Sequence, residues 1–238
     1  PVSAQTHAFL KKEALDQELA RTLQGIFLLE ELSARSLDEV MSFGERLSSS
    51  LIGEALHAHG IDCHHVDARV LIKTDDHYGC ATVNRESTYE RTAQYLLTHP
   101  GCCILGGFIA STEQMHTTTL GRGGSDYTAA LIGAAVDADT IEIWTDVDGV
   151  LTADPRKVPS AFVLETISYE EAGELAHFGA KVIHPKTMKP ARIKHIPIEI
   201  KNTFNPQAPG TRICHESSPN AFFIKGIASF LPFFAHIE

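Results

Sequence analysis

The residues with the clearest chemical signature lie in a glycine-rich segment at positions 117–126. Its three glycines allow tight backbone turns that can bring amide groups against an anion. Arg122 stands among them, and its planar guanidinium suits a carboxylate or a phosphate. Ser125 is predicted to cap the helix that follows, whose N-terminus carries free N–H groups and partial positive charge. The segment indicates an anion-binding turn, with a flexible turn and an ordinary helix cap as the alternative.

A second polar segment, at positions 144–156, follows an apolar run that predicts a buried strand. Open α/β sheets bind ligands beyond the carboxyl ends of their strands. Main-chain groups at Thr145 and Asp146 are therefore candidates for holding a nucleotide, and Arg156 is a candidate for meeting its phosphates. The spacing lacks the terminal glutamate of an EF-hand, which argues against calcium. A structural acidic turn stays open as an alternative.

The third segment, at positions 178–185, places Lys181 directly after a Gly-Ala pair. The small residues leave room for a polyphosphate that the lysine could reach. By itself this pattern is weak, because most lysines are solvated surface residues.

The elements that must position these segments begin with two helices. Helical apolar spacing covers positions 11–32. Ser36 is predicted to cap the second helix, with Glu39 as its capping-box partner and Gly60 as its stop. Glu45 lies on this second helix, near an apolar stripe that consists of Val40, Phe43, Leu47, Leu51, Ile52 and Leu56.

The rest of the chain alternates between strand-like and helical patterns. Strands are predicted over 61–66, 70–72, 102–109, 140–145 and 197–200, and helices over 87–97, 125–136, 168–177 and 185–193. Such alternation predicts an α/β fold with a mostly parallel sheet sandwiched between helices. Gly106 and Gly107, near the end of one strand, mark a place where a ligand could approach the backbone closely.

Composition narrows the range of partners. A net charge of -10 argues against a nucleic-acid surface, and no run approaches the ~18–20 apolar residues of a membrane helix. The five cysteines form no regular framework and are interpreted as reduced thiols of a cytoplasmic protein, with Cys102 and Cys103 buried in a strand. No HExxH or Cys/His set is present, so no metal site is assigned.

In combination these segments resemble the amino acid kinase superfamily, and within it the aspartate kinases. The resemblance covers about 28–212, and its markers are residues 42–48, 107–109, 118–127, 144–149, 154–156 and 178–181. The acidic pattern at 148–156 is shared with other kinases of the superfamily, whereas the segment at 118–127 is more particular to aspartate kinases. The resemblance implies a three-layer α/β/α fold. It also implies ATP-dependent phosphorylation of the L-aspartate side chain to 4-phospho-L-aspartate, the first step of lysine, threonine and methionine biosynthesis.

The resemblance also implies roles for individual residues that match the family pattern. Glu45 would pair with the α-amino group of aspartate, and Arg122 with its α-carboxylate. Phe108 and Ser125 would complete the substrate site. Asp126 would organise the catalytic lysines. The catalytic residues that the resemblance implies are Lys181, Asp126 and Arg122.

The implied cofactors are ATP and Mg²⁺. The implied nucleotide contacts are Thr145, Asp146, Leu151, Arg156, Lys181 and Val182. Both reactants are anions, so magnesium and cationic side chains must offset their repulsion. Leu151 departs from the family, which often has an aromatic residue beside the base.

The family begins with a Lys-Phe-Gly-Gly-Thr strand, and nothing in residues 1–28 matches it. We therefore expect a piece of a longer, homodimeric protein. It would comprise the catalytic domain over 1–216 and the start of a regulatory, ACT-like region over 217–238. Such a piece is expected to be weak or inactive by itself. Alternatives are a catalytically silent binding fragment, a kinase acting on glutamate, N-acetylglutamate or UMP, and a non-enzymatic assembly module.

Overall fold

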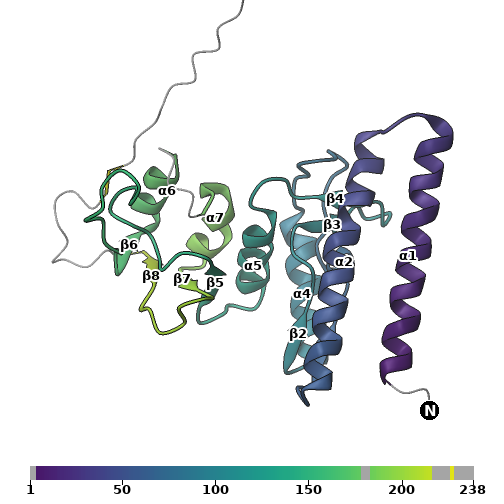
Figure 1. Ribbon diagram of the computed structural model, residues 1–238, viewed down its shortest axis with the longest axis horizontal. Coiled ribbons are helices and arrows are strands. Elements are labelled where there is room, and N and C mark those ends of the chain that lie inside the picture. The colour runs from purple at the N-terminus through teal and green to yellow at the C-terminus, as the bar shows by residue number, and fades with distance from the viewer. Residues whose placement is uncertain (1–3, 178–182, 216–225, 228–238) are drawn as a thin grey trace, which may run out of the picture. The chain divides into compact units, whose positions relative to one another are not determined.

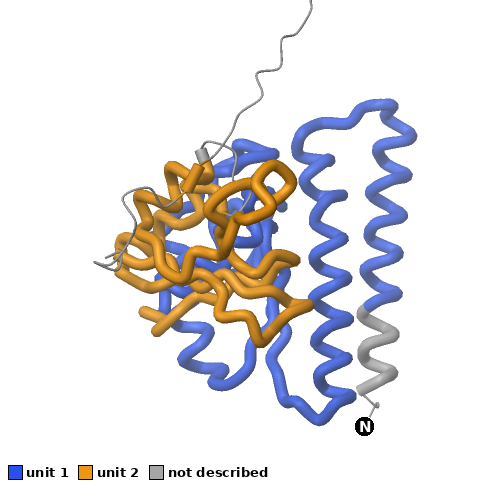
Figure 2. Tube along the Cα trace, turned by 60° about the vertical axis from the view of Figure 1, so that its left-hand side comes forward, with its two compact units in different colours: residues 1–136 blue, residues 137–238 orange. Residues whose placement is uncertain are grey.

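The computed structural model describes residues 4–177, 183–215 and 226–227 of the chain. The chain divides into two compact units, Pro1–Val136 (unit 1) and Asp137–Glu238 (unit 2), which Figure 2 distinguishes by colour. The predicted boundary at 216/217 and the region beyond it lie largely outside the described residues.

Unit 1 opens with two long helices that pack side by side, α1 (Ala4–Leu29) and α2 (Ala34–Ala58) (Figure 1). The side chain of Ser33 caps α2 by accepting a hydrogen bond from the Ser36 N–H at 3.1 Å. The prediction that Ser36 is the cap was therefore wrong by three residues. Gly60, with φ 78°, follows the end of α2 close to the predicted stop.

The buried face of α2 is mostly polar. Its buried residues are Asp38, Ser42, Phe43, Arg46, Ser49, Ser50 and Gly53. Leu51 and Ile52 of the predicted apolar stripe are 55% and 54% exposed. The apolar spacing thus identified the helix but only part of the face that it buries, around Phe43, because hydrogen bonds and ion pairs replace apolar contacts over the rest.

Two short sheets accompany these helices in unit 1. Strand β1 (Cys63–His65) runs parallel to β2 (Cys102–Ile104), and β3 (Ile109–Ser111) pairs with β4 (Thr117–Thr119) in an antiparallel hairpin. The strand predicted over 102–109 is therefore split. Phe108, with φ 70°, interrupts it, since a left-handed residue cannot continue an extended strand.

The strand predicted over 70–72 is also wrong. A short helix, α3 (Ala68–Leu71), takes its place, because the Asp67 side chain accepts a hydrogen bond from the Arg69 N–H at 3.0 Å and caps it. Helices α4 (Arg85–Thr98) and α5 (Gly124–Ala135) match predicted helices and pack against each other. The core of this unit consists of Val66, Ala68, Leu71, Ile72, Val83, Ile109, Ala110, Leu120 and Leu131.

Unit 2 contains a four-stranded sheet. Its order is β5 (Ile141–Thr145), β7 (Ile198–Asn202), β8 (Thr211–Cys214) and β6 (Thr166–Ser168). Pairs β5–β7 and β6–β8 are parallel, and β7–β8 is antiparallel. Strands β6 and β8 were not predicted. Helices α6 (Tyr169–His177) and α7 (Pro185–Ile193) match the predicted ones and contact each other.

The predicted α/β character with mostly parallel strands is confirmed, although the described strands form three separate sheets. The five cysteines are free, and Cys63 is buried. Cys102 is exposed and Cys103 is half-buried, so the expected burial of this pair was wrong. The reason is that β2, among the described strands, pairs with β1 alone in a two-stranded sheet, so that it is an edge strand with its first residue at the surface.

Candidate active site

The β3–β4 hairpin brings two predicted substrate segments to the same end of unit 1. Phe108 directly precedes β3, and the glycine-rich turn directly follows β4. Ile109 pairs with Thr119 across the hairpin, and the Leu120 N–H donates to the Phe108 carbonyl at 2.9 Å. Phe108 and the start of the turn therefore lie side by side.

The glycines of this turn are required by its geometry. Gly121 and Gly123 have φ values of 71° and 72°, in the left-handed region that favours glycine. A Cβ on Gly124 would lie 2.7 Å from Cδ2 of Phe108, closer than any side chain could sit. The phenyl ring of Phe108 can therefore pack directly against the start of α5.

Helix α5 begins differently from the prediction. Its N-cap residue is Gly123, which offers no side-chain hydrogen bond, and Ser125 lies exposed in the first turn. Ser125 is therefore not the cap. The first N–H groups of a helix have no partner within it, so an N-terminus without a capping side chain is suited to bind an anion.

The two glycines that were expected to admit a ligand instead admit other parts of the protein. A Cβ on Gly106 would lie 3.0 Å from both the Cβ and the carbonyl oxygen of Glu45 on α2. A Cβ on Gly107 would lie 2.9 Å from the Cα of Ser125 on α5. The segment 106–108 is thus where two helices meet the hairpin, and it gathers Glu45, Phe108 and Ser125 beside the turn that carries Arg122.

Three charged side chains of this region have no partner in the described part of the chain: no hydrogen bond or ion pair there engages the side chains of Glu45, Arg122 or Asp126. Arg122 is exposed, whereas Glu45 and Asp126 are half-buried. Burial raises the pKa of the Asp126 carboxyl above its ordinary value. These charges are therefore available to a ligand that carries both an amine and carboxylates.

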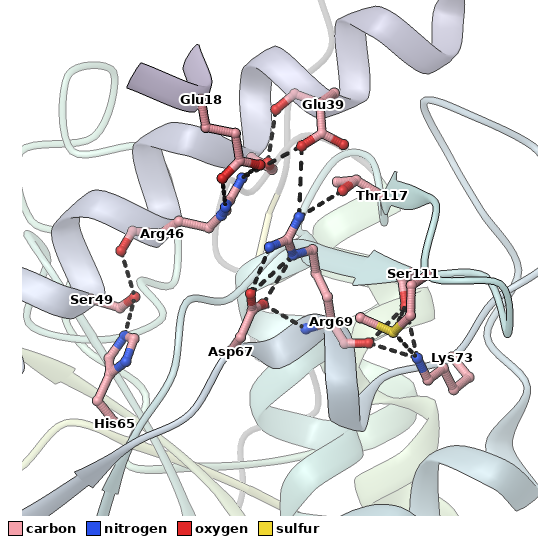
Figure 3. Close-up of polar contacts among 12 residues, drawn as sticks. Glu18, Glu39, Arg46, Ser49, His65, Asp67, Arg69, Lys73, Ser111 and Thr117 are labelled. Atoms are coloured by element: carbon pink, nitrogen blue, oxygen red, sulfur yellow. Dashed lines mark hydrogen bonds and ion pairs between the residues drawn. The ribbon is translucent and has the colours of Figure 1, made fainter. Parts of the chain in front are cut away.

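A network of ion pairs lies beside the hairpin (Figure 3). Arg46 pairs with Glu18 of α1 at 2.6 Å, and Arg69 pairs with Asp67 at 2.7 Å. Glu39 lies 3.4 Å from Arg46 and 3.6 Å from Arg69, and so links the two pairs. Although burial acts in the other direction, hydrogen bonds from Arg69 hold the pKa of Asp67 below its ordinary value.

Arg69 and a buried lysine connect this network to both strands of the hairpin. Arg69 donates to Oγ1 of Thr117 on β4 at 2.9 Å. Lys73 is 2% exposed, and its Nζ donates to the Ser111 hydroxyl on β3 and to the Arg69 carbonyl, each at 2.9 Å. Burial lowers the pKa of the Lys73 ammonium. The hairpin is therefore held by polar contacts on both of its strands.

Asp38 is a further residue of this region that the sequence did not reveal. It is completely buried at the start of α2, and its carboxylate accepts hydrogen bonds from Gly79 and Thr119. One signal was available: Asp38, Ser42, Arg46 and Ser49 recur at spacings of three and four and place one polar stripe on a helix.

In unit 2 the predicted nucleotide segment follows β5. Thr145 pairs with Asn202 across β5 and β7, and the Asp146 N–H donates to the Thr145 hydroxyl at 2.5 Å. Asp148 accepts hydrogen bonds from the side-chain amides of Asn202 at 2.7 Å and Asn205 at 3.1 Å. The acidic loop is therefore fixed to the carboxyl end of the neighbouring parallel strand.

The downstream half of this segment is held as firmly. Gly149 has φ 147°, and a Cβ there would lie 2.5 Å from Oγ1 of Thr211. Leu151 forms an isolated bridge with Val163 and is half-buried.

Arg156, the predicted phosphate contact, has a side chain that is 86% exposed. It donates to both carboxylate oxygens of Asp154, at 3.0 and 2.9 Å. These hydrogen bonds lower the pKa of the Asp154 carboxyl. The predicted nucleotide residues Lys181 and Val182 lie outside the described residues.

Comparison with known proteins identifies the family of this chain. The model of the amino acid kinase family matches residues 2–202. The chain belongs to the amino acid kinase family. The predicted amino acid kinase fold is therefore confirmed.

Among members of the family, the chain is similar to aspartokinases. It is 39% identical over 214 residues to lysine-sensitive aspartokinase 3 of Escherichia coli (strain K12), a match that covers 87% of this chain and 48% of the relative. It is also 39% identical over 219 residues to the bifunctional aspartokinase/homoserine dehydrogenase of Buchnera aphidicola subsp. Acyrthosiphon pisum (strain APS), covering 92% of this chain and 27% of the relative. The chain thus spans 27% to 48% of the length of these relatives.

A solved structure gives the same result. The crystal structure of E. coli aspartokinase III in complex with aspartate and ADP matches with a TM-score of 0.78 and 39% identity, over 86% of this chain and 47% of that chain. These similarities confirm the resemblance to aspartate kinases within the amino acid kinase family.

Two further observations concern metals and membranes. Within residues 4–177, 183–215 and 226–227, no three His, Cys, Asp or Glu side chains are grouped so that they could hold a metal ion. Of the helices in the described residues, none combines the length and the apolar character needed to cross a membrane.

Proposed function

We propose that this chain is the catalytic part of an aspartate kinase, which transfers the γ-phosphoryl group of ATP to the side-chain carboxylate of L-aspartate. The observation that carries the proposal is the convergence of Glu45, Phe108, Ser125 and the turn bearing Arg122 around residues 106–108. Family membership and the aspartate and ADP bound to E. coli aspartokinase III support it.

In this proposal, charge recognises the amino acid end of the substrate. The Glu45 carboxylate pairs with the α-amino group, and the guanidinium of Arg122 pairs with the α-carboxylate, which also lies near the uncapped start of α5. Charge-assisted hydrogen bonds of this kind are about twice as strong as neutral ones. Phe108, which lies against Gly124, forms an apolar side of the site. The side-chain carboxylate of the substrate then stays free to react.

The nucleotide is assigned to residues of unit 2, with main-chain groups at Thr145 and Asp146, the side chain of Leu151, and Arg156, Lys181 and Val182 as contacts. Magnesium would bind together with the nucleotide, since Mg²⁺ is usually held by one or two carboxylates together with substrate phosphates. It would neutralise charge as the β-carboxylate attacks the γ-phosphorus in line. Asp126 is proposed as a catalytic carboxylate, and Lys181 as the cation near the transferring phosphate.

The cellular setting is also part of the proposal. Five free cysteines suit a reducing compartment, which favours the cytoplasm. The homodimer expected of the full-length protein stays a prediction, as does the domain division at 216/217.

Binding measurements on the purified chain test the proposal. Isothermal titration calorimetry with L-aspartate, L-glutamate, N-acetylglutamate, UMP and ADP should show binding of aspartate and ADP, and weaker binding of the other acceptors. A chain that binds glutamate, N-acetylglutamate or UMP more tightly than aspartate would contradict it. Trapping of aspartyl hydroxamate in the presence of ATP and Mg²⁺ then separates a kinase from a silent binding fragment.

A further inference from the structure

The buried carboxylate of Asp38 makes three hydrogen bonds at the base of the glycine-rich turn. Its Oδ2 accepts from the Gly79 N–H at 2.8 Å and from the Thr119 N–H at 2.9 Å. Its Oδ1 accepts from the Thr119 hydroxyl at 2.8 Å. The donors come from two segments outside α2, so one side chain joins three separate parts of unit 1.

Packing alone does not account for an acid in this place. Asp38 is 0% exposed, and no cation of the described residues forms an ion pair with it. A buried carboxylate is unfavourable unless hydrogen bonds replace its hydration. Here each oxygen receives at least one donor, and two backbone N–H groups obtain an acceptor that an apolar side chain would not supply.

Both segments that Asp38 holds flank the turn that carries Arg122. Thr119 is the last residue of β4, three residues before Arg122. Gly79 lies against the turn itself, because a Cβ on Gly121 would be 3.2 Å from the Gly79 carbonyl oxygen. Asp38 therefore fixes both the chain entering the turn and the segment on which the turn rests.

Asp38 also lies on the same helix as Glu45, seven residues earlier. Seven residues are close to two helical turns, so the two side chains share one face of α2. One rigid helix thus carries the carboxylate assigned to the α-amino group and the carboxylate that holds the turn assigned to the α-carboxylate.

We propose that Asp38 is a positioning residue that sets the Arg122 turn relative to Glu45, and so controls affinity for the amino acid but not for the nucleotide. This inference rests on the proposed aspartate site. It assigns no contact between Asp38 and the substrate.

Two variants distinguish the hydrogen bonds of Asp38 from its negative charge. In Asp38→Asn the amide oxygen can accept from both N–H groups, and the amide nitrogen can donate to the Thr119 hydroxyl, which can turn to accept. In Asp38→Ala both N–H groups lose their acceptor. We expect Asp38→Ala to weaken aspartate binding about tenfold or more, and Asp38→Asn by less than about threefold, because binding depends steeply on placement of the guanidinium. ADP affinity should stay within about twofold in both variants.

Hydrogen exchange at residues 119–124 gives a readout that needs no substrate. Asp38→Ala should speed exchange of these amides relative to Asp38→Asn, whereas Glu54→Gln, on the same helix, should leave it unchanged. If Asp38→Ala does not fold, Thr119→Val removes the hydroxyl and keeps the backbone contact. Thr119→Val should weaken aspartate binding by less than Asp38→Ala is expected to, and it should leave ADP binding unchanged.

The outcomes are distinguishable. Equal aspartate affinities for Asp38→Ala and Asp38→Asn, or equal exchange of the turn amides, would overturn the inference. A loss of ADP and aspartate binding in equal measure would assign Asp38 a general structural role and overturn it as well. If the unaltered chain binds ADP but no aspartate, the proposed function fails. In that case the exchange experiment still decides whether Asp38 holds the turn.

Discussion

The candidate sites of the two units hold their charged residues in opposite ways. In unit 1, Glu45, Arg122 and Asp126 have no partner among the described residues, while the scaffold around them is tied by buried polar contacts. In unit 2, Asp148 is bonded to Asn202 and Asn205, and Arg156 is bonded to Asp154. Unit 1 therefore presents charged side chains that have no partner among the described residues. Unit 2 presents main-chain groups at the end of a strand, while the charged side chains nearby are already hydrogen-bonded to other residues.

This difference suggests two modes of recognition. A small amino acid offers few atoms, so its binding depends on direct contact with charged side chains. A nucleotide offers many atoms, and backbone groups at the end of a parallel strand can hold it. Substitutions in unit 1 should consequently have the larger effects on ligand affinity.

The largest effect is expected at Arg122. Arg122→Ala should weaken aspartate binding roughly 10- to 100-fold, because a charge-assisted pair is lost. Arg122→Lys should recover part of this loss, since a lysine keeps the charge but not the planar fork. Arg156→Ala is the counterpart in unit 2. It should weaken ADP binding by less than about tenfold. Arg156 gives up its ion pair with Asp154 when it binds a phosphate, and this loss offsets part of what the new contact contributes.

Calorimetry with aspartate and ADP checks this contrast. A larger effect of Arg156→Ala on ADP than of Arg122→Ala on aspartate would reverse the assignment of the two modes.

A glycine substitution tests the packing of the turn. Gly124→Ala should lower the free energy of unfolding by about 1–3 kcal/mol, because its Cβ has no room beside Phe108. Gly173→Ala on α6 is the matched change in unit 2, where a Cβ meets nothing within 4 Å. It should stabilise by up to about 1 kcal/mol. Urea denaturation measures both, and similar effects of the two variants would show that the turn can relax around a methyl group.

The smallest effects concern pH, and they have opposite signs in the two units. Burial raises the pKa of the Asp126 carboxyl. The stability that the protonated carboxyl contributes is therefore complete below its unfolded-state pKa and is lost as pH rises through its folded-state pKa. Arg156 lowers the pKa of Asp154, so that contribution is present above the unfolded-state pKa and is lost as pH falls through the folded-state pKa.

Denaturation at a series of pH values from about 3 to 7 separates the two carboxyls. Asp126→Asn should become more stable than the unaltered chain as pH rises. Asp154→Asn should be less stable than the unaltered chain at neutral pH and approach it in acid. A stability difference for Asp126→Asn that does not change with pH would show that its carboxyl is solvated.

Local signals predicted most of the helices and the polar segments. Apolar spacing located α2, and Pro185 at the start of α7 marked that helix correctly. The failures arose where side-chain hydrogen bonds decide backbone conformation. Asp67 converts a predicted strand into α3, and Gly123 begins α5 without a side-chain cap, in place of Ser125.

The candidate site was predictable as a set of residues but not as a geometry. The motif at 118–127 indicated Arg122, Ser125 and Asp126, yet nothing local shows that Gly106 admits Glu45 or that Asp38 reaches Thr119, 81 residues away. Contacts over such distances depend on tertiary packing, which residue types and spacing alone do not specify.

The most direct test of the central claim compares L-aspartate with succinate, which has the same two carboxylates but lacks the α-amino group. If Glu45 recognises that amine, the unaltered chain should bind aspartate more tightly than succinate. Glu45→Gln should then lose this preference by weakening aspartate alone, while Glu54→Gln on the same helix keeps it. Equal weakening of both ligands by Glu45→Gln, or an unchanged preference, would contradict the account.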